Sequence, residues 1–151
     1  MNFFNENITI VLSNKRILRK WISEAIEREG KEAGDINFIF CNDDYLLELN
    51  FKYLKHNTLT DILTFSLDDE DGILCGDIYI SLPRVKENAI KFNQKLQDEV
   101  HRIMIHGILH LAGYKDKTKR EKFVMRIKED YYLELLYSML NVNDPFIEKL
   151  I

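Results

Sequence analysis

Hydrophobic and polar residues follow two different periods in the first third of the chain. Two short runs rich in β-branched and aromatic residues, Ile8–Leu12 and Ile36–Phe40, predict strands. Between them, apolar residues recur at intervals of three and four, which predicts an amphipathic helix. Ser13 can cap this helix, and Gly30 ends it.

The remaining pattern predicts two more strands and a helical C-terminal half. Asn42 or Asp43 caps a helix that ends near Leu54. The strands Asp61–Leu67 and Gly76–Leu82 flank the acidic turn DDEDG, which suits a hairpin-like link. Three helical segments follow, at about Pro83–Phe92, Leu96–Ala112 and Lys119–Leu140. We therefore expect an α+β fold, a single mixed four-stranded β-sheet packed with about five α-helices, in one domain over residues 1–151.

The composition is that of an ordinary globular domain. Of the 151 residues, 46% are hydrophobic and 30% are charged, so the chain is long enough to bury a core. No apolar run approaches the length that spans a bilayer, and the N-terminus lacks the layout of a secretory signal. We expect a cytoplasmic protein without a membrane partner, in which Cys41 and Cys75 are reduced thiols.

The formal net charge is −4, which disfavours a protein that coats nucleic acid through bulk electrostatics. Two local stretches are nevertheless rich in cations, Asn14–Lys20 (NKRILRK) and Phe51–His56 (FKYLKH). Each is either a track for an anionic polymer or a solvated helix face, and the pattern alone leaves both interpretations open.

The stretch HGILHLAGYKDK carries the strongest chemical signal in the sequence. His106 and His110 are four residues apart, so on a helix they lie on the same face, one turn apart. Gly113 can end that helix in a left-handed conformation, and Asp116 is then the nearest carboxylate able to reach the same ion. The alternative is that both histidines are hydrogen-bonded or partly buried helix residues.

Three protein ligands leave a fourth position for water, which is the catalytic rather than the structural arrangement for zinc. The pKa of such a water falls to about 7, so hydroxide is available at neutral pH. Peptide hydrolysis of the H-E-x-x-H kind is not expected, because Gly107 stands where that mechanism needs its glutamate.

Three stretches together resemble one known family. HGILHLAGYKDK is similar to the H-G-x-L-H-L-x-G-Y-D-H signature of the YbeY family of bacterial endoribonucleases, which are also described as rRNA maturation factors. LNFKYLKHNTLTDILTF resembles the family's L-N-x-x-Y-R-…-T-D-V-L-S-F stretch, and GDIYIS resembles its G-D-I-x-I-S strand. The motifs occur in the family's order over roughly the middle half of the chain.

The resemblance implies a zinc-hydrolase-like fold with one Zn²⁺ per chain, held by three side chains. It also implies a nuclease for single-stranded RNA that acts in ribosomal RNA maturation and ribosome quality control, with the small ribosomal subunit as a partner. His106 and His110 match the first two family ligands, and Asp116 stands where the signature has its third histidine. A carboxylate there makes the site less positive, so the bound water should be somewhat less acidic.

A second departure concerns the arginine that follows the family's tyrosine. Leu54 occupies its position, so the cation that would bind phosphate is missing there. Lys55 and His56 are the neighbours that could replace it, either by binding substrate or by assisting catalysis, or they are ordinary loop residues.

The other predicted substrate-binding residues are cations of the first cation-rich stretch: Lys15, Arg16 and Arg19. Asp61 and Asp77 also match family motifs. We expect both to orient backbone near the site or to hold a ligand histidine, rather than to take part in the chemistry. The sequence does not identify a general base. Two other functions remain open, a ribosome-assembly factor with a structural zinc and a zinc hydrolase of another substrate.

Overall fold

The computed structural model describes residues 1–54, 60–67 and 72–143, with side chains up to residue 141. Helices and strands alternate through most of these residues. In chain order the elements are β1 (Asn2–Glu6), α1 (Lys15–Arg28), β2 (Glu32–Cys41), α2 (Asp43–Leu54), β3 (Ile62–Ser66), β4 (Ile73–Ser81), α3 (Leu82–Lys91), α4 (Leu96–Leu111) and α5 (Lys119–Asn143).

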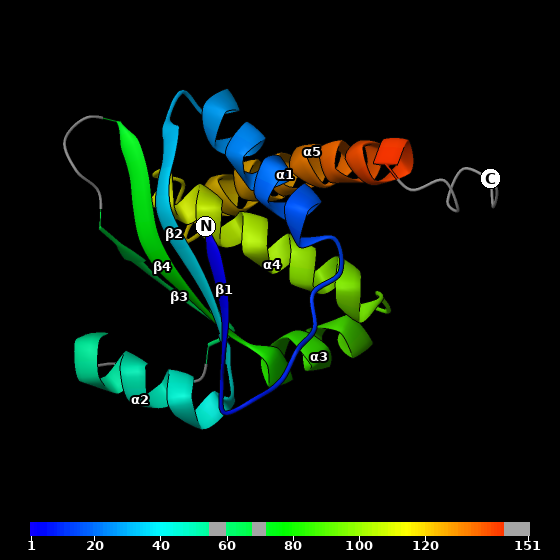
Figure 1. Cartoon of the computed structure of the whole chain (residues 1–151). Coiled ribbons are helices and arrows are strands. Elements are labelled where there is room, and N and C mark those ends of the chain that lie inside the picture. Colours follow the sequence, from blue (N-terminus) through cyan, green and yellow to red (C-terminus); the bar gives the residue numbers. More distant parts are fainter. Residues whose placement is uncertain (55–59, 68–71, 144–151) are drawn as a thin grey trace.

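The four strands form one mixed sheet in the order β1-β2-β4-β3, which confirms the predicted architecture. β1, β2 and β4 are parallel, and β3 pairs with β4 in antiparallel register, as the hairpin-like link requires. Figure 1 shows α1, α4 and α5 together on one side of this sheet and α2 apart from them at its lower end. The predicted turn itself lies mostly outside the described residues.

The predicted first strand, Ile8–Leu12, is not a strand in the structure. β1 is Asn2–Glu6, whereas Ile8–Leu12 connects β1 to α1 without pairing in the sheet. The alternation in Ile8–Leu12 is nevertheless real, because Ile8, Ile10 and Leu12 pack against the core while the residues between them are exposed. An extended chain that lies on a core has the same period of two as a strand, so the pattern could not separate them.

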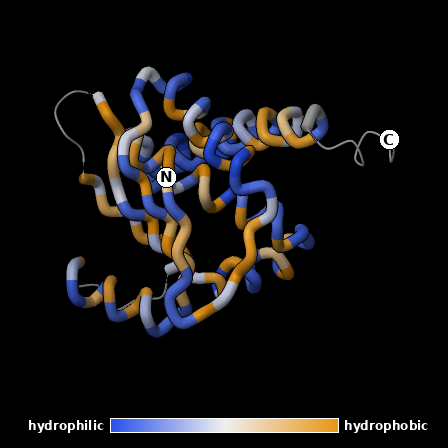
Figure 2. The backbone as a smooth tube through the Cα atoms, in the orientation of Figure 1, coloured by the Kyte–Doolittle hydropathy of each residue, from blue (hydrophilic) through white to orange (hydrophobic). Residues whose placement is uncertain are grey.

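The core lies between the sheet and the three helices on its covered face. Trp21 of α1 is fully buried, and its indole Nε1 donates a 2.7 Å hydrogen bond to the carbonyl of Tyr132 in α5. Hydrophobic positions recur along the strands and along these helices (Figure 2). The buried side chains between the sheet and these helices join one cluster, while Cys41, Leu46 and Leu63 form a second one beside α2. The packing of the first cluster fixes α5 against α1 and α4.

Gly107 allows α4 to lie very close to the sheet. A Cβ at this position would come within 2.8 Å of Ile78 Cγ2 and 3.0 Å of Ile62 Cδ1. Gly107, which rules out the peptidase motif, therefore has a packing role. It lets α4, the helix that carries both histidines, lie close to β3 and β4. Ile62 and Ile78 face α4, so their neighbours along each strand face the opposite side of the sheet.

One of the two predicted helix caps is present in the structure. Asn42 Oδ1 accepts a 2.9 Å hydrogen bond from the Tyr45 N–H, as a capping side chain does. α1 is instead preceded by Asn14 in a left-handed conformation, so Ser13 is not its cap. Cys41 and Cys75 are not joined by a disulfide, which agrees with the expected reduced thiols. None of the described helices is long and apolar enough to cross a membrane.

Candidate metal centre

The structure brings His106, His110 and Asp116 together. The two Nε2 atoms are 2.9 Å apart, and Asp116 Oδ2 lies 3.3 Å from the first and 3.4 Å from the second. A tetrahedral ion with bonds of about 2.0–2.1 Å keeps its ligand atoms roughly 3.3 Å apart. Asp116 Oδ2 stands at this spacing from both nitrogens, while the two Nε2 atoms lie closer to each other than that. Among the described residues they form a candidate metal cluster.

Each imidazole is oriented by a bond to its other nitrogen. His106 Nδ1 is 2.6 Å from Glu129 Oε2, and His110 Nδ1 is 2.9 Å from the carbonyl oxygen of Tyr114. A carbonyl or an ionised carboxylate can only accept, so both Nδ1 atoms carry the hydrogen. Both Nε2 atoms consequently present lone pairs to each other and to the Asp116 carboxylate.

Three such acceptors in mutual contact repel one another unless a positive charge lies between them. A proton on one imidazole can relieve the repulsion, and so can a metal ion. Burial by itself would lower the pKa of His106, but the hydrogen bond and charge of Glu129, with the charges of Asp116 and Asp61, raise it. The same surroundings favour a bound cation, so the donor set fits a divalent metal.

The loop that carries Asp116 is held at both ends. At the end of α4, Gly113 adopts a φ of 109°, and the N–H groups of Gly113 and Tyr114 donate to the carbonyls of His110 and Leu109. These two bonds form a Schellman motif, which turns the chain sharply after the second histidine. The helix therefore stops where the sequence predicted.

At the other end of the loop, Thr118 and Glu121 form a capping box at the start of α5. Glu121 Oε1 accepts from the Thr118 N–H, and Thr118 Oγ1 accepts from the Glu121 N–H. Glu121 is thus engaged in starting a helix. Asp116 lies between the two motifs, and its position follows from both.

A second network supports the same loop from α1. The Tyr114 hydroxyl donates a 2.5 Å hydrogen bond to Glu29, which also accepts from Tyr132 and from Lys128 Nζ. Burial alone would raise the pKa of the Glu29 carboxyl, but these three donors hold it below its ordinary value. The backbone of Tyr114 thus orients His110 while its side chain anchors the loop to the end of α1.

Glu129 and Arg102 have roles in the site that the sequence did not predict: the sequence suggests Glu129 only as a substitute third ligand and gives Arg102 no role. Glu129 is only 5% exposed, and its two oxygens face different partners, His106 and the Arg102 guanidinium. Arg102 also donates a 2.7 Å hydrogen bond to Asp130. A carboxylate on the Nδ1 side of a ligand histidine fixes the ring and strengthens it as a donor to metal.

A cavity of about 240 Å³ opens beside the cluster. Its lining comes from α3, α4, α5, the α4–α5 loop and Asp61, and it includes His106 and Asp116. Asp61 accepts a 3.4 Å hydrogen bond from Asn88 Nδ2, and burial raises the pKa of its carboxyl despite the opposing influence of His106. Asp61 thus lies near the cluster, as expected, but Glu129 rather than Asp61 holds the histidine.

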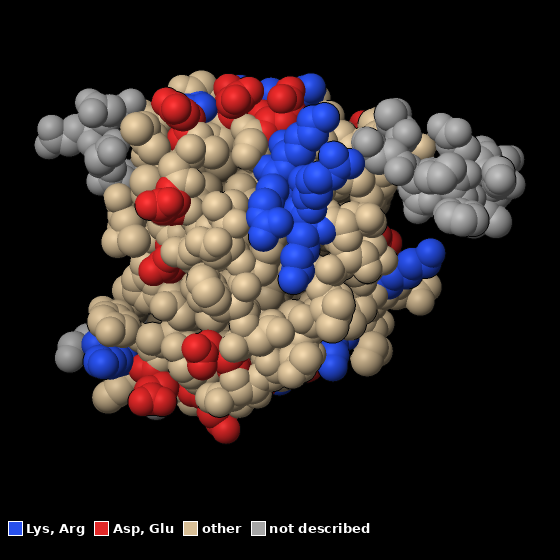
Figure 3. Space-filling model, viewed as in Figure 1, with Lys and Arg blue, Asp and Glu red and all other residues tan. Residues whose placement is uncertain are grey.

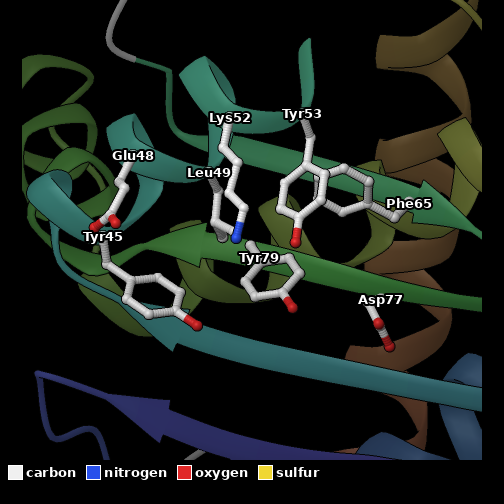
Figure 4. Close-up of a pocket in the computed structure, with 8 residues that line it drawn as sticks. All are labelled: Tyr45, Glu48, Leu49, Lys52, Tyr53, Phe65, Asp77 and Tyr79. Carbon is white, nitrogen blue, oxygen red and sulfur yellow. The ribbon is translucent and has the colours of Figure 1, made fainter. Parts of the chain in front are cut away.

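Asp77 lies on the other face of the sheet, which corrects the expectation that it supports the site. Its Oδ1 accepts a 2.9 Å hydrogen bond from Asn37, and it lines a separate cavity of about 440 Å³ between α2, β3 and β4. Figure 4 shows the aromatic side chains of this cavity around Lys52. Lys52 of the second cation-rich stretch therefore points into a cavity that the candidate ligands do not line.

The predicted RNA contacts are distributed unevenly. Lys15, Arg16 and Arg19 are exposed on α1, where Figure 3 shows a band of positive side chains. No described residue of α1 lines the cavity beside the cluster. Leu54 is 44% exposed at the end of α2. Lys55 and His56 lie outside the described residues, so their predicted contacts stay predictions.

A mixed sheet with a His-His-Asp cluster beside an open cavity places this chain in the class of candidate metal-dependent hydrolases. The model of the family "Endoribonuclease YbeY" matches residues 2–137. The chain belongs to this family, which confirms the resemblance seen in the sequence and, with it, the predicted enzyme class, an endoribonuclease and hence a hydrolase.

Similar sequences and a similar solved structure cover nearly the whole chain. The Endoribonuclease YbeY of Christiangramia forsetii is 50% identical over 91% of this chain and 94% of the relative. That of Flavobacterium psychrophilum is 46% identical over 91% and 98%. The solution structure of TM1509 from Thermotoga maritima matches with a TM-score of 0.63 and 29% identity, covering 95% of this chain and 93% of the other. This similarity confirms the α+β fold.

Proposed function

We propose that this protein is a zinc-dependent endoribonuclease that cleaves single-stranded RNA during ribosomal RNA maturation and ribosome quality control in the cytoplasm. His106, His110 and Asp116 are its zinc ligands, one ion per chain, and the small ribosomal subunit is its partner. The observation that carries the proposal is the spacing of the three donor atoms, 2.9 to 3.4 Å from one another.

Zinc at these three ligands would supply a Lewis acid and a water of lowered pKa beside the cavity. Residues of the chain orient these ligands before any metal binds. Glu129 and the Tyr114 carbonyl keep a hydrogen on each Nδ1, so both Nε2 atoms remain donors to metal. The three anchored side chains leave the fourth direction of a tetrahedral ion to water or substrate.

The same arrangement weighs against a purely structural zinc. Structural zinc sites are closed by four protein ligands. The cluster offers three within the described residues, and the Asp116 side chain remains 40% exposed at the cavity. An assembly factor without catalysis and a hydrolase of another substrate are therefore the alternatives that the experiment must separate.

The test measures metal and cleavage on the same preparations. Protein purified without added metal is analysed for zinc and then incubated with an unstructured RNA oligonucleotide, with and without chelator. We expect about one zinc per chain and cleavage that chelator abolishes and zinc restores. The double variant His106→Ala, His110→Ala should lose both, while the exposed Asp35→Ala should lose neither.

Zinc retained without any RNA cleavage would favour the assembly factor. Zinc-dependent hydrolysis of simple phosphodiesters, with RNA left intact, would favour another substrate. Full zinc occupancy in the double histidine variant would refute the ligand assignment.

A further inference from the structure

The cavity beside the cluster has an unusual charge balance for a site that must admit a phosphodiester. Four carboxylates line it: Asp61, Glu99, Asp116 and Glu129. Arg102 is the only lysine or arginine among the described residues of the lining. A phosphate that enters this cavity meets mainly negative charge, so its attraction depends on a metal ion and on this guanidinium.

Burial acts on two of these carboxyl groups. It raises the pKa of both Asp61 and Glu99, and so favours their neutral forms. Arg102 stays charged, because its hydrogen bonds to Asp130 and Glu129 outweigh the effect of its burial and raise its pKa. The cavity thus retains a permanent cation within the lining that includes His106 and Asp116.

The Arg102 side chain is also held in place. Nη1 donates to Glu129 at 2.8 Å and Nη2 donates to Asp130 at 2.7 Å, while the side chain remains 20% exposed. These bonds engage two of the five N–H groups of a guanidinium. A fixed, partly exposed fork with unused donors suits a phosphate oxygen better than a flexible lysine would, since little entropy remains to be lost.

Leu54 supplies no such group. It stands where the family motif has its arginine, and it is not part of the lining. Arg102 comes from a different element, α4, one turn before His106. The cation missing from one motif can therefore be provided by a residue that the motif does not contain.

We propose that Arg102 contacts the scissile phosphate of the RNA and takes the role of the arginine that is absent at Leu54. This inference rests on the proposed endoribonuclease function. The competing explanation is that Arg102 only holds Glu129, which in turn orients His106. The two explanations differ in what happens to zinc binding when Arg102 is replaced.

The experiment compares Arg102→Gln and Arg102→Lys with Arg126→Gln. Arg126 is the matched control, because it approaches the same Glu129 and Asp130 carboxylates at 4.0 Å but is 64% exposed and does not line the cavity. Zinc affinity is measured by competition with a chromophoric chelator. Single-turnover cleavage of a short single-stranded RNA at saturating zinc gives the rate.

We expect Arg102→Gln to lower the cleavage rate by about 100-fold, the scale of removing one donor to transition-state charge. Zinc affinity should stay within about threefold of wild type, and Arg102→Lys should recover part of the rate as a point charge. Arg126→Gln should match wild type. Cleavage by Arg102→Gln within twofold of wild type, or a loss of zinc affinity parallel to the loss of rate, would overturn the inference.

Two further measurements test Lys55 as the alternative cation and separate the role of Arg102 from the proposed endoribonuclease function. Lys55→Ala is assayed in parallel, and a large loss there with none in Arg102→Gln would assign the missing cation to Lys55. Binding of a DNA oligonucleotide of the same sequence, which presents phosphates without being cleaved, should weaken at least fivefold in Arg102→Gln. A wild type that binds this probe through Arg102 but cuts no RNA would contradict the proposed function alone.

Discussion

Two regions of this molecule carry charged side chains in positions that suggest function, and they are built in opposite ways. At the candidate metal centre, His106 and His110 are half-buried, and each has its Nδ1 bound to a fixed acceptor. On α1, Lys15 and Arg16 are exposed, and Figure 3 shows a band of positive side chains over this helix. The first region is suited to hold one ion in one geometry, whereas the second can act only through the summed field of its charges.

The difference indicates which effects should be sharp and which should be gradual. Replacing a residue that fixes the metal centre should change one measured quantity strongly, because the supporting bonds are specific. Replacing an exposed cation should change binding slightly and in proportion to salt. We therefore expect the largest effects at the metal centre and the smallest on α1.

Asp116 should be the most sensitive single position after the histidines. Asp116→Ala leaves two ligands, so zinc affinity should fall by more than the 10–100-fold that is typical of losing an outer partner. Asp116→His should retain the metal, since imidazole is also a zinc ligand. Chelator competition measures both variants. Equal affinity in Asp116→Ala and wild type would mean that the third ligand is another residue.

Glu129 should have the next largest effect, although it would not touch the metal. Glu129→Gln keeps an oxygen that can accept from His106 Nδ1 but removes the charge, so zinc affinity should fall by about 10–100-fold. Asp130→Asn is the matched control, because Asp130 shares Arg102 with Glu129 and has no contact with His106 among those described. A similar loss in both variants would show that the effect comes from Arg102.

The metal centre was partly predictable because its three candidate ligands lie within eleven residues. The i, i+4 spacing, the glycine stop and the nearby carboxylate are all local features. Glu129 is 23 residues from His106, so only the packing of α5 against α4 shows the contact. A signal was present, since Glu129 shares a buried face with Met125 and Tyr132, where a lone carboxylate needs a partner.

The fold shows a similar limit. The run ITIVL has a strong strand propensity, yet the edge strand is the more polar Asn2–Glu6. β1 gains its place because Phe3 stacks on Phe38 of β2 at 5.7 Å and because its backbone pairs with β2. Pairing between segments far apart in sequence can override local propensity, and one chain's pattern does not report it.

Glu29 follows the C-terminal end of α1, whereas the exposed Lys15 and Arg16 lie at the N-terminal end of the same helix. Its carboxylate is buried and tied to Tyr114, so Glu29→Gln should lower the free energy of unfolding at pH 7 by about 1–3 kcal/mol. The folded-state pKa lies below the unfolded one, so this stabilisation is present above the unfolded pKa and is lost as the pH falls through the folded pKa. Denaturation of metal-free protein between pH 3 and 7 measures it.

Glu24→Gln on the same helix provides the control. Glu24 pairs with Arg28 at 3.1 Å, but its side chain is 42% exposed, so the change should cost about 0.5 kcal/mol or less. Equal losses in the two variants would mean that the Glu29 network contributes no more than a surface ion pair.

Replacing the exposed cations of α1 should have the smallest effect, a small change in the salt dependence of RNA affinity. If RNA crosses this surface, Lys15→Ala or Arg16→Ala should flatten the dependence of log affinity on log salt by about one unit or less, and should leave zinc affinity unchanged. Arg19 should contribute less, because its Nε donates to the Met1 carbonyl and its guanidinium stacks on Phe3 at 5.0 Å. Lys31→Ala, beyond the end of the helix, is the control. A slope identical to wild type in all three α1 variants would return this surface to ordinary solvated helix and leave RNA binding to the cavity beside the metal centre.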